Sequence, residues 1–170
     1  MKPTTSIFDI LRRLDGLETR FKELEITATK YNQYQEVLQV PATQFGNLEK
    51  LREQLNLRCL MWRSLNEWEE KTDAWVQEKF ANINAKDIQA KADQFSKICN
   101  RVEKNLPPNP ISQKLKVLVD TFKAAMPVVI ALRNDNLKGE HWDEINHLIG
   151  QKLEIDREDF TLESLIKLNA

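Results

Sequence analysis

Apolar residues recur every three or four positions along almost the whole chain, which is the spacing of one face of an α-helix. The first such stripe alternates steps of three and four, the a/d pattern of a coiled coil. It consists of Ile7, Ile10, Leu14, Leu17, Phe21, Leu24, Ala28 and Tyr31. Burial of each large apolar side chain contributes about 1.5–3 kcal/mol, so we expect this stripe to be buried along its length. The predicted first helix runs from about Ser6 to Leu38 and ends before Pro41.

A second long helix is predicted from about Phe45 to Phe80. Its stripe consists of Leu48, Leu51, Leu55, Cys59, Trp62, Leu65, Thr72 and Trp75. Met61, Trp68 and Trp75 repeat every seven residues on an adjacent row, so the apolar face is broad and should contact more than one neighbouring helix. Two long helices joined by a short turn are expected to form an antiparallel hairpin.

Capping residues and prolines divide the next stretch into two shorter helices. Asn84 is a predicted N-cap with Asp87 in the first turn, and this third helix ends at Pro107-Pro108. Asn109 and Pro110 begin the fourth helix as N-cap and first residue. The predicted buried stripes are Ile88, Ala92, Phe95, Cys99, Val102 and Leu106 in the third helix, and Ile111, Leu115, Leu118, Phe122, Met126 and Val129 in the fourth.

The last part of the chain is predicted to be less regular. Pro127 should kink or end the fourth helix, because proline lacks an N–H and clashes with the preceding turn. A fifth helix is expected over about Glu140–Ile149 with Gly150 as its stop, and a sixth over Leu162–Leu168 after an N-cap at Thr161. A helix of little more than two turns is marginal alone, so we infer that the chain is a piece of a longer protein.

Together these elements predict an all-α fold: an elongated helical bundle with a long antiparallel helical hairpin followed by shorter helices. We place a domain boundary at the proline pair. Residues 1–106 would hold the hairpin and the third helix, and residues 107–170 the helices that follow.

Composition and charge narrow the function classes. The chain is 30 % charged and 41 % hydrophobic, a mix typical of a soluble folded protein. Its 25 Lys and Arg nearly balance its 26 Asp and Glu, which leaves a net charge of −1. We therefore expect neither nucleic acid nor a membrane as a partner. No stretch reaches the roughly 18 consecutive apolar residues of a membrane span, and the N-terminus is not expected to be a signal peptide.

The sequence offers little material for catalysis. Its 4 glycines lack the spacing of a phosphate-binding P-loop, so we expect no nucleotide or other cofactor. His141 and His147 would lie on opposite faces of one helix, so we expect no metal site. Cys59 and Cys99 are expected to be buried free thiols, although one disulfide between them is arithmetically possible. Neighbouring carboxylates such as those of Glu69 and Glu70 are expected on solvated faces. We therefore predict no catalytic residue and no enzymatic activity.

The 4 tryptophans, Trp62, Trp68, Trp75 and Trp142, have two interpretations. Their helical spacing favours a role in the core of the bundle. The alternative is that they anchor a partner, since tryptophan is enriched at interface hot spots. His141 and Trp142, near the start of the fifth helix, could similarly lock a helix corner onto its neighbour or form a recognition element.

The stretch from Met126 to Gly150 resembles dynein heavy chains at the point where the tail passes into the linker, called N-terminal region 2. The shared pattern is a proline before an apolar run, then Leu-Arg-Asn, and then His-Trp at the start of an apolar helix. It is matched by Pro127, Leu132, Arg133, Asn134, Leu137, His141, Trp142 and Ile145. Glu140 departs from it, because the family usually has arginine before His-Trp. The resemblance extends over roughly Leu48–Leu168, including the spaced tryptophans and Phe160-Thr161-Leu162.

The resemblance implies a function that periodicity alone does not. The parent would be a large microtubule motor whose ring of ATPase modules lies C-terminal to Ala170, and whose linker moves over that ring in the power stroke. This piece would be non-catalytic, with residues 1–106 as a tail-proximal bundle and 107–170 as the start of the linker-like region. The structural or interface candidates are Trp62, Trp68, Trp75, Pro127, Leu132, Arg133, Asn134, His141 and Trp142.

The same resemblance implies partners and a location. The expected partners are the remainder of the same heavy chain and dynein accessory chains or another heavy chain, with microtubules involved only indirectly. The upstream segment Tyr34–Leu57 has the style of axonemal heavy chains. We therefore expect the protein in the cytoskeleton of the cytoplasm, in the axoneme of a cilium or flagellum.

Two other functions stay open. A free-standing spectrin-like or coiled-coil scaffold would bind protein partners through an apolar surface left over after the bundle closes. A small α-helical enzyme would need a polar cluster with perturbed pKa values in a pocket.

Overall fold

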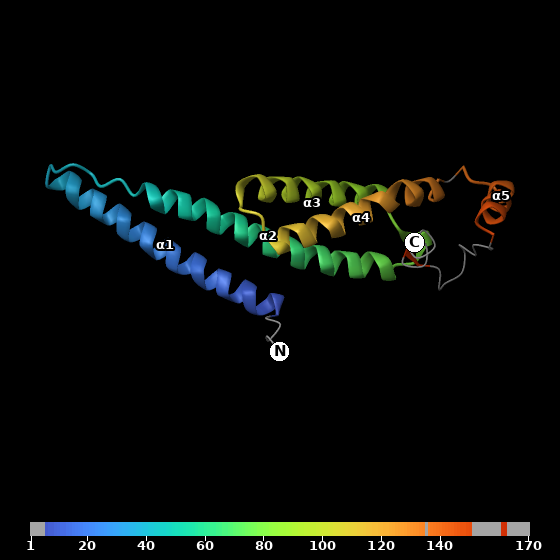
Figure 1. The fold of residues 1–170 in the computed structure, drawn as a ribbon, viewed down its shortest axis with the longest axis horizontal. Coiled ribbons are helices and arrows are strands. Elements are labelled where there is room, and N and C mark those ends of the chain that lie inside the picture. Colours follow the sequence, from blue (N-terminus) through green and yellow to red (C-terminus); the bar gives the residue numbers. More distant parts are fainter. Residues whose placement is uncertain (1–5, 135, 151–160, 163–170) are drawn as a thin grey trace. The chain divides into compact units, whose positions relative to one another are not determined.

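The computed structural model describes residues 6–134, 136–150 and 161–162. The regular elements in these ranges are α1 (Ile7–Val37), α2 (Gly46–Gln77), a 3-10 turn at Phe80–Asn82, α3 (Ala85–Asn105), α4 (Pro110–Leu132) and α5 (Gly139–Ile149) (Figure 1). Extended pairing among the described residues is limited to one isolated bridge between Lys79 and Thr161. The predicted all-α fold is therefore confirmed. None of the helices in the described ranges is long and apolar enough to cross a membrane.

The helices divide between two compact units. The first combines the chain up to Asn66 with Ile98–Gln113, and so holds α1, the first part of α2 and the end of α3. The second combines Glu67–Lys97 with the described residues from Lys114 onward, which include most of α4 and all of α5. The predicted boundary between residues 106 and 107 stays a prediction.

The predicted helix ends are largely confirmed by capping contacts. The Asn84 Oδ1 accepts a hydrogen bond from the Asp87 N–H at 3.3 Å, and the Asn109 Oδ1 accepts one from the Ser112 N–H at 2.8 Å. These bonds satisfy N–H groups that the first turn of a helix leaves without partners. α5 ends at Gly150, whose φ of 74° is the left-handed conformation that glycine adopts at low cost.

Pro127 does not end the fourth helix. α4 continues past it to Leu132, and the proline ring lies on the exposed side of the helix. Met126 and Val129 on either side of it are each 1 % exposed. Their burial holds the helix together across the missing N–H, which the local rule does not take into account. The predicted sixth helix lies outside the described residues, apart from Leu162.

The core of the first unit lies between α2 and α3. Its buried members are Leu57, Met61, Val102 and Leu106, with Leu60, Trp62, Ile98 and Ile111 packed against them. Nearby on α2, Cys59 is also buried. α2 thus uses a broad apolar face, as the two adjacent rows of its sequence predict.

The core of the second unit follows the predicted stripes of the third and fourth helices with one difference, because Val119 is buried where the stripe predicts Leu118, which is half-buried. Its buried apolar side chains include Trp68 of α2 and a larger set from α3 and α4. The α3 and α4 members are Ile88, Ala92, Phe95, Leu115, Val119, Phe122, Met126 and Val129. The exposed fractions of these eight side chains are 7 % or less.

The stripe of α1 is only half buried, which contradicts the sequence-based expectation. Leu14 and Phe21 are 8 % and 7 % exposed, whereas Leu17, Leu24 and Tyr31 are 48 %, 56 % and 56 % exposed. The buried residues form one row and the exposed residues a second row on a neighbouring edge of the helix. α2 covers the row with Leu14 and Phe21. The stripe is therefore buried along one of its two rows and exposed along the other.

Candidate functional site

Charged side chains hold α1 and α2 together as an antiparallel hairpin. The Arg63 guanidinium donates to the Asp15 carboxylate at 2.7 Å and to both Glu18 oxygens at 2.7 and 3.3 Å. Farther along the hairpin, Arg52 pairs with Glu25. Each exposed pair contributes little by itself, about 0–1 kcal/mol, but the set requires one register between the helices.

The closed end of the hairpin is held by neutral hydrogen bonds. The Gln35 side chain donates to the Thr43 hydroxyl and accepts from the Thr43 N–H, both at 2.8 Å. Together with the Arg63 and Arg52 pairs, these bonds connect α1 and α2 at three levels. Sliding by one residue would break all three sets of contacts at once.

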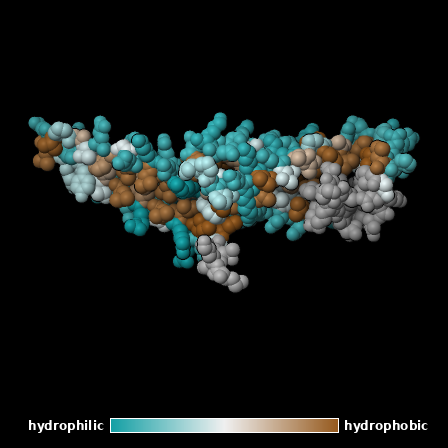
Figure 2. All heavy atoms as spheres, in the orientation of Figure 1, coloured by the Kyte–Doolittle hydropathy of each residue, from teal (hydrophilic) through white to brown (hydrophobic). Residues whose placement is uncertain are grey.

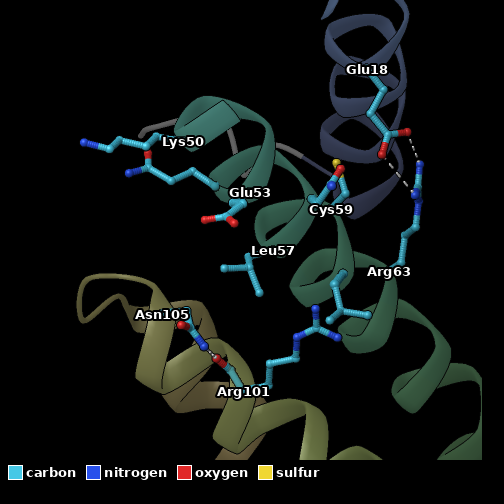
Figure 3. Close-up of a pocket in the computed structure, with 11 residues that line it drawn as sticks. Glu18, Lys50, Glu53, Leu57, Cys59, Arg63, Arg101 and Asn105 are labelled. Atoms are coloured by element: carbon cyan, nitrogen blue, oxygen red, sulfur yellow. Dashed lines mark hydrogen bonds and ion pairs between the residues drawn. The ribbon is translucent and has the colours of Figure 1, made fainter. Parts of the chain in front are cut away.

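Cys59 is buried beside this charged cluster. Its side chain is 1 % exposed, and its thiol lies beside the Glu18 carboxylate (Figure 3). Burial, and then the neighbouring carboxylate of Glu18, raise the pKa of the Cys59 thiol to about 11. Arg63 has the opposite effect on its partner, because its hydrogen bond lowers the pKa of Glu18. The thiol is therefore protonated near neutral pH, and only a thiolate is an effective nucleophile.

A polar groove of about 740 Å³ opens beside the Glu18–Arg63 pair (Figure 3). Its wall combines residues of α1, α2 and the end of α3, all from the first unit. Carboxylates from Glu18 and Glu53 alternate with cationic groups from Lys50, Arg63 and Arg101. This mixture does not favour a ligand of either charge. No cluster of three potential metal ligands occurs in the described part of the chain.

In the second unit, Trp68 is the centre of an aromatic cluster. Its ring centroid lies 5.1 Å from that of Phe95, 5.4 Å from that of Phe122 and 6.0 Å from that of Trp75, in edge-to-face arrangements. Such pairs contribute about 0.5–1.5 kcal/mol beyond the burial of their area. Trp68 is only 2 % exposed. The cluster therefore connects α2, α3 and α4 through one residue.

Two ion pairs border the aromatic cluster. The Lys114 Nζ lies 2.7 Å from a Glu69 oxygen, and the Lys123 Nζ lies 2.7 Å from an Asp93 oxygen. The hydrogen bond from Lys123 lowers the pKa of Asp93. Both bridges connect helices that already meet at Trp68, and they add directional contacts at the rim of an apolar core.

The Leu-Arg-Asn motif marks the end of α4. The Arg133 guanidinium lies 6.0 Å from the centroid of the Phe80 ring, within the range of a cation–π interaction. Its Nε is buried and has no hydrogen-bond partner among the described residues. Asn134 directs the turn that follows, because its Oδ1 accepts from the Asn136 N–H at 3.0 Å. Leu132 itself is half-buried.

His141 and Trp142 have different surroundings at the start of α5. The His141 Nδ1 accepts a hydrogen bond from the Lys138 N–H at 3.0 Å, which caps the helix. Its side chain is otherwise exposed, whereas Trp142 is half-buried. His141 thus performs a local structural role.

The structure brings together only part of the residues that the sequence singles out. Trp68 and Trp75 share the aromatic cluster, while Trp62 packs on the core of the first unit. Trp62 and Trp75 are half-buried, and Pro127 lies on an exposed surface. The sequence analysis missed the pairing of Glu18 and Glu25 with arginines of α2. A signal for it existed, because these glutamates lie seven residues apart and flank the buried row of α1, as charged positions do in coiled coils.

Comparison with known proteins gives one family. The family model described as "Dynein heavy chain, N-terminal region 2" matches residues 48–170. Human dynein axonemal heavy chain 6 is 32 % identical over 157 residues, which are 92 % of this chain and 4 % of that protein. The dynein-1-beta heavy chain of the flagellar inner arm I1 complex of Chlamydomonas reinhardtii is 26 % identical over 133 residues, 78 % of this chain and 3 % of that one. The chain thus spans only a small part of the length of these relatives.

Proposed function

Since this chain belongs to the dynein heavy chain family, through N-terminal region 2, we propose that it is a non-catalytic mechanical segment of a motor heavy chain. It would connect the tail of the motor to the linker that moves during the ATP-driven power stroke. The observation that carries this proposal is the match over residues 48–170, which covers most of the chain and includes the Leu-Arg-Asn and His-Trp motifs.

The contacts within each unit support a mechanical role. α1 and α2 have 31 and 32 residues, so each is about 46–48 Å long at 1.5 Å per residue. Ion pairs hold them in one register, and Trp68 connects α2 to α3 and α4. Long helices with packed side chains resist bending, so a force applied at one end of such a segment is not lost in soft joints.

We assign ATP hydrolysis to other parts of the parent protein. The 4 glycines of this chain lack the spacing of a P-loop. The pKa of the Cys59 thiol is raised, which makes this thiol a poor nucleophile. The proposal also includes partners: the rest of the heavy chain, accessory chains or another heavy chain, and microtubules only indirectly. Since the relatives are named for axonemes and flagella, we propose a ciliary or flagellar location in the cytoskeleton.

This function is tested by measuring the ATPase rate and the microtubule gliding velocity of the same variants. The parent heavy chain would be prepared with Trp68→Ala, with the milder Trp68→Phe, and with Val117→Ala as a matched control at a side chain that is 63 % exposed. We expect the ATPase rate to stay within about two-fold while the microtubule gliding velocity falls by about ten-fold or more for Trp68→Ala, and by less for Trp68→Phe. Val117→Ala should change neither rate.

Two results would contradict the proposal. Gliding velocity that is unchanged in Trp68→Ala would show that the segment transmits no force. A purified 170-residue chain that hydrolyses ATP would show that the segment is catalytic, and one that pellets with microtubules would show that it binds them directly.

One observation favours the scaffold alternative as a second candidate. A spectrin-like scaffold should keep an apolar surface after its bundle closes, and α1 does so with Leu17, Leu24 and Tyr31. The two functions are compatible, because a mechanical segment can also carry a docking surface.

A further inference from the structure

α1 carries an uncovered row of apolar side chains, which we call the outer row: Leu17, Leu24 and Tyr31. They lie seven residues apart and are 48 %, 56 % and 56 % exposed. Their spacing places them on one edge of the helix, next to the edge that packs on α2. Figure 2 shows hydrophobic residues gathered in a strip along the hairpin of α1 and α2.

The outer row lies on the side of the hairpin opposite the polar groove. Glu18 faces that groove, and on α2 so do Lys50 and Glu53 (Figure 3). Leu51 lies on the other edge of α2 and is 52 % exposed. By helical spacing it is on the same side as Leu24, so the row of α1 continues onto α2.

Arginines border this surface. Arg13 and Arg20 follow Ile10 and Leu17 by three positions, which places them one turn away along the outer edge. Within the described part of the chain, neither has a hydrogen-bond or ion-pair partner. The carboxylates of α1 that meet α2 are those of Asp15, Glu18 and Glu25, and they point toward Arg63 and Arg52 on the other edge. Arg13 and Arg20 therefore border the uncovered apolar row, with one carboxylate, that of Asp9, one turn before Arg13 on the same edge.

We propose that this surface docks an amphipathic α-helix of a second polypeptide, with apolar residues at heptad spacing flanked by Asp and Glu. A helix fits because the outer row repeats every seven residues, the period at which two helices stay in register. Acidic flanks complement Arg13 and Arg20, and they speed the encounter as well as select the partner.

The exposed charge favours a separate partner over a permanent neighbour or a second copy. Permanent interfaces are more hydrophobic, whereas separate partners use a polar rim that stays soluble when the surface is free. A second copy would bring the same arginines to the interface. This proposal deepens the scaffold candidate above by naming the chemistry of its partner, and it does not depend on whether the chain is a motor segment.

Two synthetic peptides of about 28 residues test the chemistry of the occupant. Both have leucine at the a and d positions, one with glutamate and the other with lysine at the flanking positions. Binding to the 170-residue chain is measured by fluorescence anisotropy. We expect the glutamate peptide to bind at least about ten-fold more tightly than the lysine peptide, with the difference shrinking at high salt. Equal affinities would overturn the proposal.

Variants locate the binding on α1. The double variant Leu17→Asp and Leu24→Asp should weaken glutamate-peptide binding by at least about ten-fold, while Val117→Asp on α4 should leave it unchanged. The double variant Arg13→Glu and Arg20→Glu should reverse the preference toward the lysine peptide. These arginines are exposed, so the reversal can be measured even if the leucine variants lose helical circular dichroism. An unchanged preference would disprove the role of the arginines.

The source of the occupant is tested in the parent protein. Leu24 is replaced by the photoreactive p-benzoylphenylalanine, and the cross-linked product is identified by mass spectrometry. A cross-link to an acidic amphipathic helix of another polypeptide supports the proposal. A cross-link within the same heavy chain overturns it, as does concentration-dependent dimerisation of the 170-residue chain that the Leu17→Asp and Leu24→Asp variant abolishes.

Discussion

At the scale of single residues, the surroundings of Cys59 show how packing changes chemistry. A cysteine next to an arginine often has a lowered pKa and becomes reactive. Here the guanidinium of Arg63 is already bonded to the carboxylates of Asp15 and Glu18, and the thiol meets Glu18. Arg63 therefore neutralises the carboxylates of Asp15 and Glu18, and burial keeps the Cys59 thiol protonated.

The raised pKa of Cys59 predicts low reactivity in the folded chain. With a pKa of about 11, only about one thiol in a thousand is ionised at pH 8. Labelling by iodoacetamide at pH 8 should therefore be slow, and in urea it should approach the rate of a free thiol. Mass spectrometry of the labelled Cys59 peptide measures both rates. Fast labelling of the folded chain would contradict the assigned surroundings.

The same shift predicts a loss of stability in alkali. The pKa of the Cys59 thiol is higher in the folded chain than in the unfolded chain. Such a group contributes its full stabilisation at a pH below its pKa in the unfolded chain, and this contribution is lost as the pH rises toward its pKa in the folded chain. For Cys59 this window extends from about 8.5 to about 11. Cys59→Ala should remove that part of the pH dependence, which urea denaturation at several pH values would detect.

At the scale of elements, each helix is defined by its ends and by what covers its apolar face. α3 and α4 have N-caps at Asn84 and Asn109, and neighbouring helices cover their stripes. α1 has an N-cap too, because the Ser6 Oγ accepts from the Phe8 N–H at 3.2 Å. However, its stripe is covered on one edge only. Similar local patterns thus lead to different degrees of burial.

Trp68 should be the most costly substitution in α2. Trp68→Ala removes the ring that contacts Phe95, Phe122 and Trp75, and we expect a loss of about 3–5 kcal/mol in the free energy of unfolding. Urea denaturation followed by circular dichroism measures it. Val117→Ala, at an exposed position on α4, should change stability by less than about 0.5 kcal/mol. Equal effects of the two substitutions would rule out a central role for Trp68.

Pro127 should cost stability in α4. It lies inside the helix with its ring exposed, so Pro127→Ala would restore a backbone N–H without disturbing the core. Proline in a helix interior costs about 3 kcal/mol relative to alanine, and greater freedom of the unfolded chain offsets part of this. We expect a gain of about 1–3 kcal/mol in the free energy of unfolding, measured by the same denaturation. A loss would show that the proline shapes a contact that the helix needs.

At the scale of the whole molecule, the chain forms two compact units that use different kinds of contact. The first combines a small apolar core at Leu57 and Met61 with ion pairs that set the register of the α1–α2 hairpin. The second relies on Trp68 and the buried stripes of α3 and α4. The aromatic cluster includes no residue of α1.

Deleting residues 1–44, and α1 with them, should therefore leave the aromatic cluster intact. We expect the near-UV circular dichroism of the tryptophans to be retained in the shortened chain, while Cys59 becomes accessible to iodoacetamide. The 170-residue chain with Arg63→Ala serves as a milder comparison, because this substitution weakens only the hairpin. Loss of the near-UV signal on deletion would show that the second unit depends on α1.

The sequence by itself determined the helices, their caps and the family. These properties are local or nearly so: the hydrogen bond that the Asp87 N–H donates to Asn84 spans three residues, and a stripe depends only on 3.6 residues per turn. The buried stripes of α3 and α4 were therefore predictable. The match to dynein heavy chains likewise depends on ordered residues along the chain and needs no coordinates.

Only the tertiary structure decided which faces are covered and which distant residues meet. Arg63 and Asp15 are 48 positions apart, and nothing in the local pattern selects this pair over other opposite charges. The protonated state of Cys59 and the central place of Trp68 follow from such encounters as well. Leu17 and Leu14 belong to one stripe in the sequence, yet one is exposed and the other buried. Helical periodicity defines the direction in which a side chain points, but burial requires a neighbouring helix in that direction.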